Sequence, residues 1–264
     1  VGLGQKLGDG EGLCVPVHAS ISGLVTAVEP RPHPGGGQVL SVVIENDYQD
    51  TPASALEPHL DLSGLTKEEI VSIIREAGIV GMGGATFPTD IKAVTAQGRV
   101  DTILVNACEC EPYITADDAL LCTYPEQVLR GMGVLMAVLE PKRAVLAVED
   151  NKSEAVGILK KQMETFPGIE LLILPTRYPQ GAEKQLIQAV TGRQVPPGAL
   201  PKDVGCAVFN AATFASIYKA VYEGEPVTRR IVTVTGEGVR EPKNLIVRIG
   251  TPFSEVIAAA GGLT

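Results

Sequence analysis

The sequence lacks the features that would place the protein in a membrane or on a nucleic acid. No run approaches the roughly 18 apolar residues that a membrane-spanning helix needs. Basic residues are scarce, since 22 Lys and Arg stand against 31 Asp and Glu, and no basic cluster offsets the net charge of −9. We therefore expect no nucleic-acid groove and no direct membrane span.

Cysteine is also sparse. The five cysteines include no Cys-x-x-Cys spacing of the kind that zinc and iron–sulfur sites use. Cys108 and Cys110 are flanked by Glu109 and Glu111, whose negative charges oppose thiolate formation. We predict reduced thiols and no bound metal.

An initiator methionine is absent, because the chain begins at Val1 directly within a patterned segment. We expect an excised piece of a longer protein. What the chain does contain is enough apolar material for a large core: 45% of its 264 residues are apolar and 20% are charged. This composition is typical of a globular protein with one large domain and smaller attachments.

Residues 1–55 are predicted to form a compact β module. Apolar and small polar residues alternate through residues 15–28, as in half-buried strands, and the β pattern returns at residues 39–45. Between them, residues 30–37 contain three prolines and three glycines, which predicts a loop and no strand. The segments GQKLG and VHASISGLV resemble the barrel-sandwich hybrid modules of biotinyl and lipoyl domains. No lysine stands at a hairpin tip to tether a cofactor, so a docking or structural role is favoured.

Residues 62–226 alternate between helical and strand patterns, which predicts an α/β domain with a mainly parallel sheet. Three short apolar runs are the expected strands: Thr102–Val105, Arg143–Val148 and Glu170–Leu174. Two capping boxes mark helix starts, Thr66 with Glu69, and Thr123 with Glu126.

A glycine-rich turn at residues 78–89 follows the first of these helices. It is not a dinucleotide-binding fingerprint, because a helix precedes it and Thr86 stands where the third glycine would fall. It is not a P-loop either, since no Gly-Lys-Ser/Thr follows. The remaining interpretation is a run of backbone N–H groups without β-carbons, which a flat anionic ligand can approach closely. The alternative is a tight turn between two helices.

Polar residues follow the predicted strands, where ligands of open α/β sheets bind. Residues 106–113 bring two glutamates and an amide, although a solvated acidic turn would look the same. Residues 175–184 bring an aromatic, a glycine, a carboxylate and a lysine to a strand-to-helix turn. Asn210 and Thr213 lie near a helix start, where capping alone would explain both.

Taken in order, the segments GMGGATFPTDIK, VNACECEPYITADD, TRYPQGAEKQLI with TGRQVPPG, and VFNAATF resemble RnfC, the NADH-oxidising subunit of the Rnf ion-pumping electron-transport complex. The likeness covers nearly the whole chain. The same segments more distantly resemble the flavin subunit of respiratory complex I.

The resemblance implies that FMN is bound noncovalently and that NADH is the substrate. The flavin residues that it implies are Gly81, Gly83, Gly84, Lys92, Asn106, Glu109, Tyr178, Gly181, Asn210 and Thr213. The NADH residues that it implies are Phe87, Glu111 and Glu183. Hydride transfer is then carried by the flavin, with no catalytic side chain. The chain departs from the complex I pattern at Met82, Cys108, Ala182 and Phe209.

Residues 228–264 predict strand, turn, strand and helix, and resemble the start of a soluble-ligand-binding β-grasp module. The family continues beyond this point to a region with two 4Fe–4S clusters, whose cysteines the chain does not contain. The resemblance therefore implies a peripheral subunit on the cytoplasmic face of the membrane, associated with other subunits, although this piece alone is expected to be soluble. Two alternatives stay open: an RnfC-like subunit of a cobalamin or amino-acid reductase system, and a redox-silent docking module.

Overall fold

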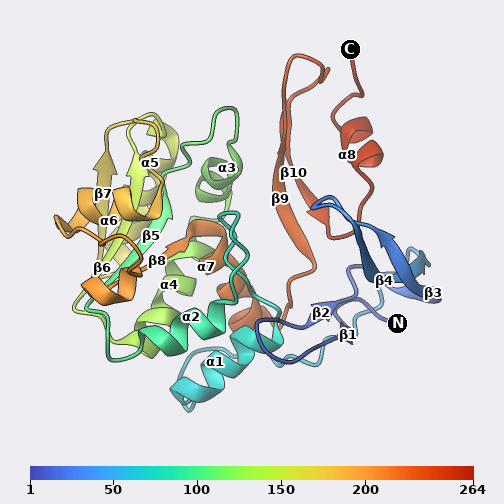
Figure 1. The fold of residues 1–264 in the computed structure, drawn as a ribbon, viewed down its shortest axis with the longest axis horizontal. Helices are drawn as coiled ribbons and strands as arrows, with labels where there is room; N and C mark the ends of the chain where they lie inside the picture. Colours follow the sequence, from blue (N-terminus) through green and yellow to red (C-terminus); the bar gives the residue numbers. More distant parts are fainter.

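The computed structural model describes residues 1–264 and consists of three parts in chain order. In Figure 1 the central α/β domain lies on the left, a long hairpin stands beside it, and the amino-terminal β module lies on the right. No helix of the chain combines the length and the apolar character that crossing a bilayer requires.

The central domain is organised around one parallel sheet in the order β7–β6–β5–β8. Its strands are β5 (Thr102–Ala107), β6 (Arg143–Glu149), β7 (Ile169–Leu174) and β8 (Cys206–Asn210). The predicted parallel sheet is thus confirmed, and its three predicted strands are found. The fourth strand, β8, was not predicted from its sequence pattern.

Two helical layers cover the sheet, because alternate strand residues face opposite sides. Ile103 and Val105 pack into the larger core, whereas Leu104 packs with α6 on the other face. The helices are α1 (Lys67–Glu76), α2 (Thr89–Ala96), α3 (Ala116–Thr123), α4 (Pro125–Leu139), α5 (Ser153–Gln162), α6 (Glu183–Thr191) and α7 (Ala211–Tyr218).

The two predicted capping boxes had different outcomes. At α1, the Glu69 N–H donates to Thr66 Oγ1 at 3.2 Å and the Thr66 N–H donates to Glu69 Oε2 at 2.8 Å, which confirms the first box. At α4, Tyr124 is the N-cap residue and its side chain makes no cap hydrogen bond, so the second box is wrong. Pro125 occupies the first helical position there, and its missing N–H needs no partner.

The amino-terminal module contains the short pair β1 (Lys6–Gly8) and β2 (Val17–His18) and the long hairpin β3 (Gly23–Pro32) and β4 (Gln38–Asn46). The prediction that residues 30–37 exclude a strand is wrong at its start. Pro30 pairs with Leu40 and Pro32 with Gln38, because a two-stranded hairpin leaves each strand with a free edge that tolerates missing N–H donors. The predicted half-burial is also incomplete, since Leu24 is 68% exposed.

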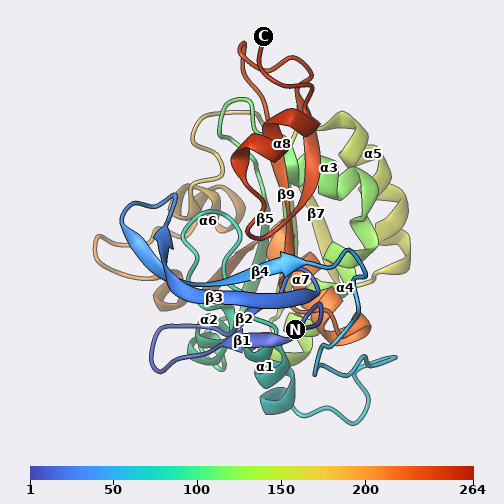
Figure 2. The same cartoon turned by 90° about the vertical axis from the view of Figure 1, so that its right-hand side faces the viewer.

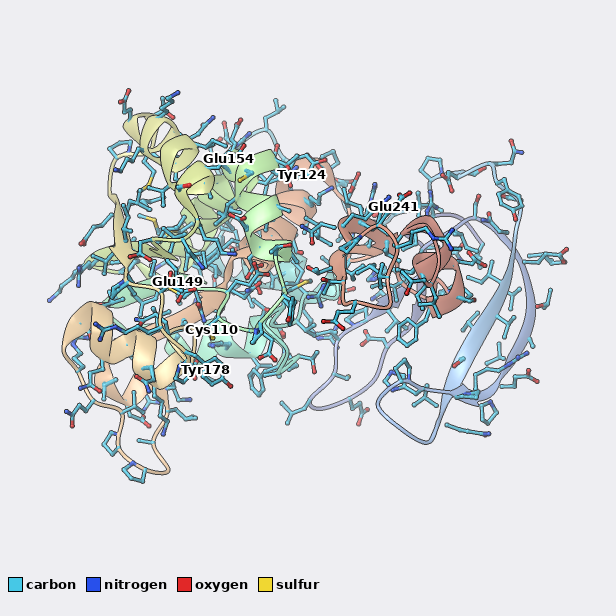
Figure 3. The ribbon with its side chains drawn as sticks, turned by 90° about the horizontal axis from the view of Figure 1, so that it is seen from above. Cys110, Tyr124, Glu149, Glu154, Tyr178 and Glu241 are labelled. Atoms are coloured by element: carbon cyan, nitrogen blue, oxygen red, sulfur yellow. The ribbon has the colours of Figure 1, made fainter.

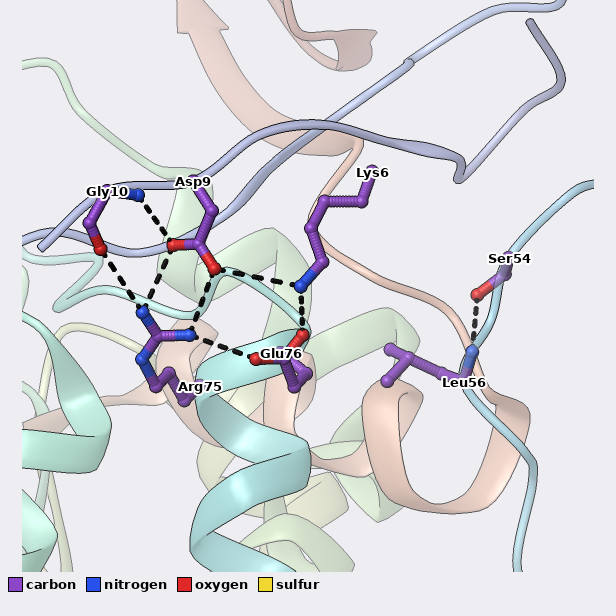
Figure 4. A network of polar contacts seen from close by, with 7 residues as sticks. All are labelled: Lys6, Asp9, Gly10, Ser54, Leu56, Arg75 and Glu76. Carbon is purple, nitrogen blue, oxygen red and sulfur yellow. Dashed lines mark hydrogen bonds and ion pairs between the residues drawn. The ribbon is translucent and has the colours of Figure 1, made fainter.

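Charged side chains attach this module to the rest of the chain. Arg75, near the end of α1, donates to Asp9 at 3.0 and 3.2 Å, and Lys6 pairs with Glu76 beside it (Figure 4). On the other side, Arg248 donates to both carboxylate oxygens of Asp50.

The carboxyl-terminal part has the predicted order of strand, turn, strand and helix. It consists of the antiparallel hairpin β9 (Arg229–Val234) and β10 (Lys243–Arg248), followed by α8 (Phe253–Ala259). Figure 1 shows the hairpin between the central domain and the amino-terminal module, and Figure 2 shows β3 and β4 crossing in front of its base. Asn244 of β10 donates to Thr115 Oγ1 at 2.9 Å, just before α3. The hairpin therefore borders the loops that follow β5.

Two glycines of α4 test the close packing of α4 against α7. A Cβ at Gly131 would lie 1.9 Å from the Phe214 carbonyl oxygen, whereas a Cβ at Gly133 would meet nothing within 4 Å. We expect Gly131→Ala to lower the free energy of unfolding by about 1–3 kcal/mol or more through overpacking. Gly133→Ala should raise it by about 0.5–1 kcal/mol, because alanine is the better helix former. Urea unfolding of both variants measures the difference, and equal stabilities would contradict this packing.

Candidate functional site

The glycine-rich turn connects α1 to α2 and leaves backbone donors unused. The Gly81 N–H donates to the Phe87 carbonyl at 2.8 Å, and the Met82 N–H donates to Thr213 Oγ1 at 3.0 Å. The N–H groups of Gly83 and Gly84 have no acceptor within the protein. Gly84 has a φ of +111°, which side chains rarely adopt. The turn therefore presents two free donors at a place where the backbone is uncovered.

The carboxyl ends of β5 and β8 bring two amides beside this turn. The Asn106 Nδ2 donates to the Gly181 carbonyl at 2.8 Å, and its Oδ1 accepts from the Cys108 N–H at 3.1 Å. Asn210 caps α7, because its Oδ1 accepts from the Ala212 N–H at 2.9 Å. All four amide atoms of these two side chains have partners within the protein, which fixes both orientations.

Two adjoining cavities open at this point and share Gly83, Asn106, Gly181 and Asn210. The first, the glycine-turn cavity, has a volume of about 370 Å³ and is also lined by Gly81, Phe87, Thr89, Lys92, Glu183 and Thr213. The second, the hairpin cavity, has a volume of about 500 Å³ and is also lined by Gly84, Glu109, Glu111, Asp117 and Arg230. All predicted site residues except Tyr178 line one of these two cavities.

The glycine-turn cavity combines a cation, a carboxylate and an unpaired hydroxyl. Lys92 Nζ lies 3.1 Å from Glu183 Oε1 and 5.0 Å from the centre of the Phe209 ring. Thr89, at the start of α2, is 1% exposed and its Oγ1 has no hydrogen-bond partner. The predicted flavin residue Lys92 and the predicted NADH residue Glu183 are thus paired with each other and do not occupy separate cavities.

The hairpin cavity contains a network of carboxylates. Glu109 accepts from the Asp117 N–H at 2.9 Å at the start of α3, and its carboxylate lies 3.7 Å from the buried Lys152 Nζ. Asp117 Oδ2 in turn accepts from Asn210 Nδ2 at 2.6 Å. Removal from water, together with the nearby charge of Glu109, raises the pKa of Asp117 from 3.8 to about 7.

Tyr178 lies apart from the turn, in a third cavity of about 310 Å³ that we call the outer cavity. It is 74% exposed and lies near Cys110 and Glu149 (Figure 3). Glu149, at the end of β6, is buried: its Oε1 accepts from the Arg177 N–H at 3.2 Å and its Oε2 has no partner. The outer cavity adjoins the hairpin cavity, because Glu109 and Glu111 line both.

The buried Cys108 thiol is a poor nucleophile. Burial of Cys108, and secondarily the charge of Glu149, raises the pKa of its thiol to about 12. The sequence also indicated that thiolate formation is disfavoured here, because Glu109 and Glu111 flank the cysteines. The main causes in the structure are instead burial and a carboxylate from the neighbouring strand, β6.

Four residues of the site were missed in the sequence: Thr89, Asp117, Glu149 and Arg230. Thr89 and Asp117 stand in the first turns of α2 and α3, within the segments GMGGATFPTDIK and VNACECEPYITADD, and the family resemblance implies no role for either side chain. Glu149 directly follows the predicted strand Arg143–Val148, and a polar residue at the carboxyl end of a parallel strand is a sequence signal for a site. Arg230 lies in another module, on β9, and no local pattern connects it to the turn.

The raised pKa of Asp117 predicts a pH-dependent stability. The folded protein holds this proton more tightly than the unfolded chain, so the contribution of Asp117 to the free energy of unfolding falls as pH rises from about 4 to about 7. Asp117→Asn removes the ionisation and retains an acceptor for Asn210. The stability of the variant relative to wild type should therefore increase across this range and level off above it. Urea unfolding at pH 4 to 8 measures this difference, and a constant difference would refute the assignment.

Comparisons with known proteins agree with this architecture. Residues 74–219 match the Nuo51 FMN-binding domain, residues 1–49 the RnfC barrel sandwich hybrid domain, and residues 231–264 the SLBB domain. The NAD⁺-reducing [NiFe]-hydrogenase in its H₂-reduced state has a related fold, with a TM-score of 0.66 over 74% of this chain and 39% of that one, at 23% identity.

Curated relatives are closer in sequence. The chain is 44% identical to a subunit of the Na⁺-translocating ferredoxin:NAD⁺ oxidoreductase complex of Acetobacterium woodii, over 99% of this chain and 60% of that protein. It is 43% identical to the corresponding subunit of the proton-translocating complex of Clostridium ljungdahlii, over 93% of this chain and 54% of that protein. The chain spans just over half the length of these relatives. It belongs to the Nuo51 FMN-binding domain family and, within it, to the RnfC proteins.

Proposed function

We propose that the chain binds FMN and NADH at the two joined cavities and serves as the flavin-bearing part of an Rnf-type NADH oxidoreductase subunit. The observation that carries the proposal is the convergence at one edge of the sheet. The free N–H groups of Gly83 and Gly84 lie beside the fixed amides of Asn106 and Asn210. Membership of an FMN-binding family supports the same conclusion.

The residues present fit a flavin. The uncovered backbone of the turn admits a flat ring closely, and the unpaired Thr89 hydroxyl and Lys92 give donors for a phosphate or for sugar hydroxyls. When bound, FMN supplies the hydride chemistry. The chain binds and orients it: Asn106 and Asn210 hold their amides in place. Asp117, whose pKa is raised to about 7 by burial and by the charge of Glu109, can hold a proton near neutral pH beside Asn210.

The nucleotide would meet Phe87, Glu183 and Glu111. Phe87 is 43% exposed and lines the glycine-turn cavity, which suits it for stacking on a base or nicotinamide ring. Glu183 has one oxygen on Lys92, and its other oxygen is available to accept ribose hydroxyls. Tyr178 and Glu149 stand at the outer cavity, where a long ligand leaving the hairpin cavity past Glu111 would reach them.

Electrons would then leave toward iron–sulfur centres outside the residues described, two 4Fe–4S clusters in the longer protein. We place the subunit at the cytoplasmic face of the membrane as a peripheral component with other subunits. The names of the A. woodii and C. ljungdahlii relatives, ferredoxin:NAD⁺ oxidoreductase complexes, favour this assembly over a cobalamin or amino-acid reductase system.

Gly83→Ala tests whether FMN binds at the turn. Its Cβ would lie 3.4 Å from the Asn210 Cβ, an ordinary contact, so the fold should be retained while the methyl group enters both cavities. We expect FMN binding to weaken by about 1–3 kcal/mol, the usual scale of overpacking. FMN fluorescence quenching gives the dissociation constants. Gly133→Ala, remote from the cavities, is the matched control and should leave affinity unchanged. Equal affinity in all three proteins would remove the turn from the site.

Glu183→Gln tests the nucleotide role. We expect the variant to retain FMN but to lose NADH-driven flavin reduction, or to accept NADPH more readily, because a carboxylate beside a ribose repels a 2′-phosphate. Stopped-flow flavin bleaching with NADH and NADPH measures both effects. Glu183 also stands in the first turn of α6, where a carboxylate stabilises a helix by roughly 0.3–1 kcal/mol.

Glu154→Gln controls for this helix effect, because Glu154 also lies in the first turn of its helix, α5. Both variants should melt slightly lower, and only Glu183→Gln should change the nucleotide kinetics. If Glu183→Gln reduces flavin at the wild-type rate with unchanged nucleotide preference, its role is limited to the helix terminus.

A further inference from the structure

Arg230 reaches the glycine-rich turn from a different module. It stands on β9, opposite Val247 of β10, and is half-buried between the hairpin and the central domain. One of its terminal nitrogens, Nη2, donates to the Met82 carbonyl at 2.9 Å, and this is the only hydrogen bond that its side chain makes within the protein. A guanidinium carries five N–H donors, so most of its donors remain unused.

Arg230 is the only cationic side chain that lines the hairpin cavity. The other ionisable side chains around it are Glu109, Glu111, Asp117, Cys108 and Cys110. The negative charge of two of the three carboxyl groups, Glu109 and Asp117, is reduced. Lys152 Nζ lies 3.7 Å from Glu109, and Asp117 is only partly ionised near neutral pH because its pKa is raised to about 7. Burial lowers the pKa of Arg230 itself, because the guanidinium gives up water without gaining a carboxylate in direct contact.

The free donors of the turn lie beside this cation. Gly83 and Gly84 follow Met82 directly, line the same cavity and have unpaired N–H groups. A guanidinium together with successive free backbone N–H groups is the donor set that proteins use for phosphate. Lys92, in the adjoining cavity, has two of its three donors engaged, by Glu183 and by the Val208 carbonyl, so it has only one left for a ligand.

We propose that Arg230 of the carboxyl-terminal hairpin binds a phosphate group of the nucleotide ligand, together with the N–H groups of Gly83 and Gly84. The proposal rests on the proposed function, because it takes the ligand to be a phosphorylated flavin or dinucleotide. The hairpin module thereby contributes a binding residue to the site. The phosphate belongs either to FMN or to the pyrophosphate of NADH, and the two sources share this chemistry.

The opposing interpretation is that Arg230 only braces the hairpin against the turn through the Met82 carbonyl. Arg230→Gln separates the two, because glutamine keeps a donor for that carbonyl and loses the charge. Arg230→Lys keeps the positive charge but loses the planar guanidinium group, which can donate two parallel hydrogen bonds to one phosphate. Arg229→Gln is the matched control, since Arg229 is the neighbouring residue of the same strand, is exposed and pairs with Glu225 at 3.3 Å.

The experiment compares ligands with and without phosphate by titration calorimetry: FMN against riboflavin, and ADP-ribose against adenosine. We expect Arg230→Gln to weaken one phosphorylated ligand by about 10- to 100-fold, the scale of a charge-assisted hydrogen bond, and its unphosphorylated counterpart by less than about 2-fold. Arg230→Lys should recover part of the loss, and Arg229→Gln should change nothing. If Arg230→Gln loses affinity only for FMN, Arg230 binds the flavin phosphate. If it loses affinity only for ADP-ribose, Arg230 binds the pyrophosphate of the dinucleotide.

Equal changes for phosphorylated and unphosphorylated ligands would overturn the proposal and leave Arg230 as a brace. A wild-type chain that binds neither flavin nor ADP-ribose would refute the proposed function instead. In that case inorganic pyrophosphate decides the present proposal: it should raise the melting temperature of wild type and of Arg229→Gln but not of Arg230→Gln. An equal rise in all three proteins, or no rise in any, would remove phosphate binding from Arg230.

Discussion

The site depends on how one residue of the glycine-rich turn is held. The Met82 N–H donates to Thr213 on α7, and the Met82 carbonyl accepts from Arg230 on β9, so two distant parts of the chain fix the turn from both sides. These two bonds satisfy the backbone just before Gly83 and leave the next two N–H groups without acceptors. Because Gly83 and Gly84 are exposed, water satisfies these donors until an anionic or polar ligand takes its place.

The charges around this turn are arranged so that carboxylates and cations lie in pairs across element boundaries. Glu109 pairs with Lys152, and Glu183 pairs with Lys92, while Asp117 shares its carboxylate with the Asn210 amide. Each pair connects segments that lie far apart along the chain. The acidic excess that gives the chain its net charge of −9 is thereby moderated locally around the turn.

Much of the fold was predictable because its signals are local. The apolar runs of β5, β6 and β7 and the capping box of Thr66 are each encoded within a few residues, and the structure confirms them. The exceptions have physical reasons as well. Pro30 and Pro32 belong to a strand because a two-stranded hairpin leaves an edge unpaired. α4 begins at Pro125 without a side-chain cap, and the proline nitrogen has no N–H that needs a partner.

By itself, the sequence determined the α/β class, the parallel sheet and the place of the turn after α1, and it singled out twelve of the residues that line the two cavities. Only the tertiary structure decided that Lys92 and Glu183 form one pair, that Tyr178 stands at a separate cavity, and that Arg230 belongs to the site. The reason is distance along the chain. Met82 and Arg230 are 148 residues apart, and their hydrogen bond exists only because the hairpin packs beside the central domain, which no local pattern encodes.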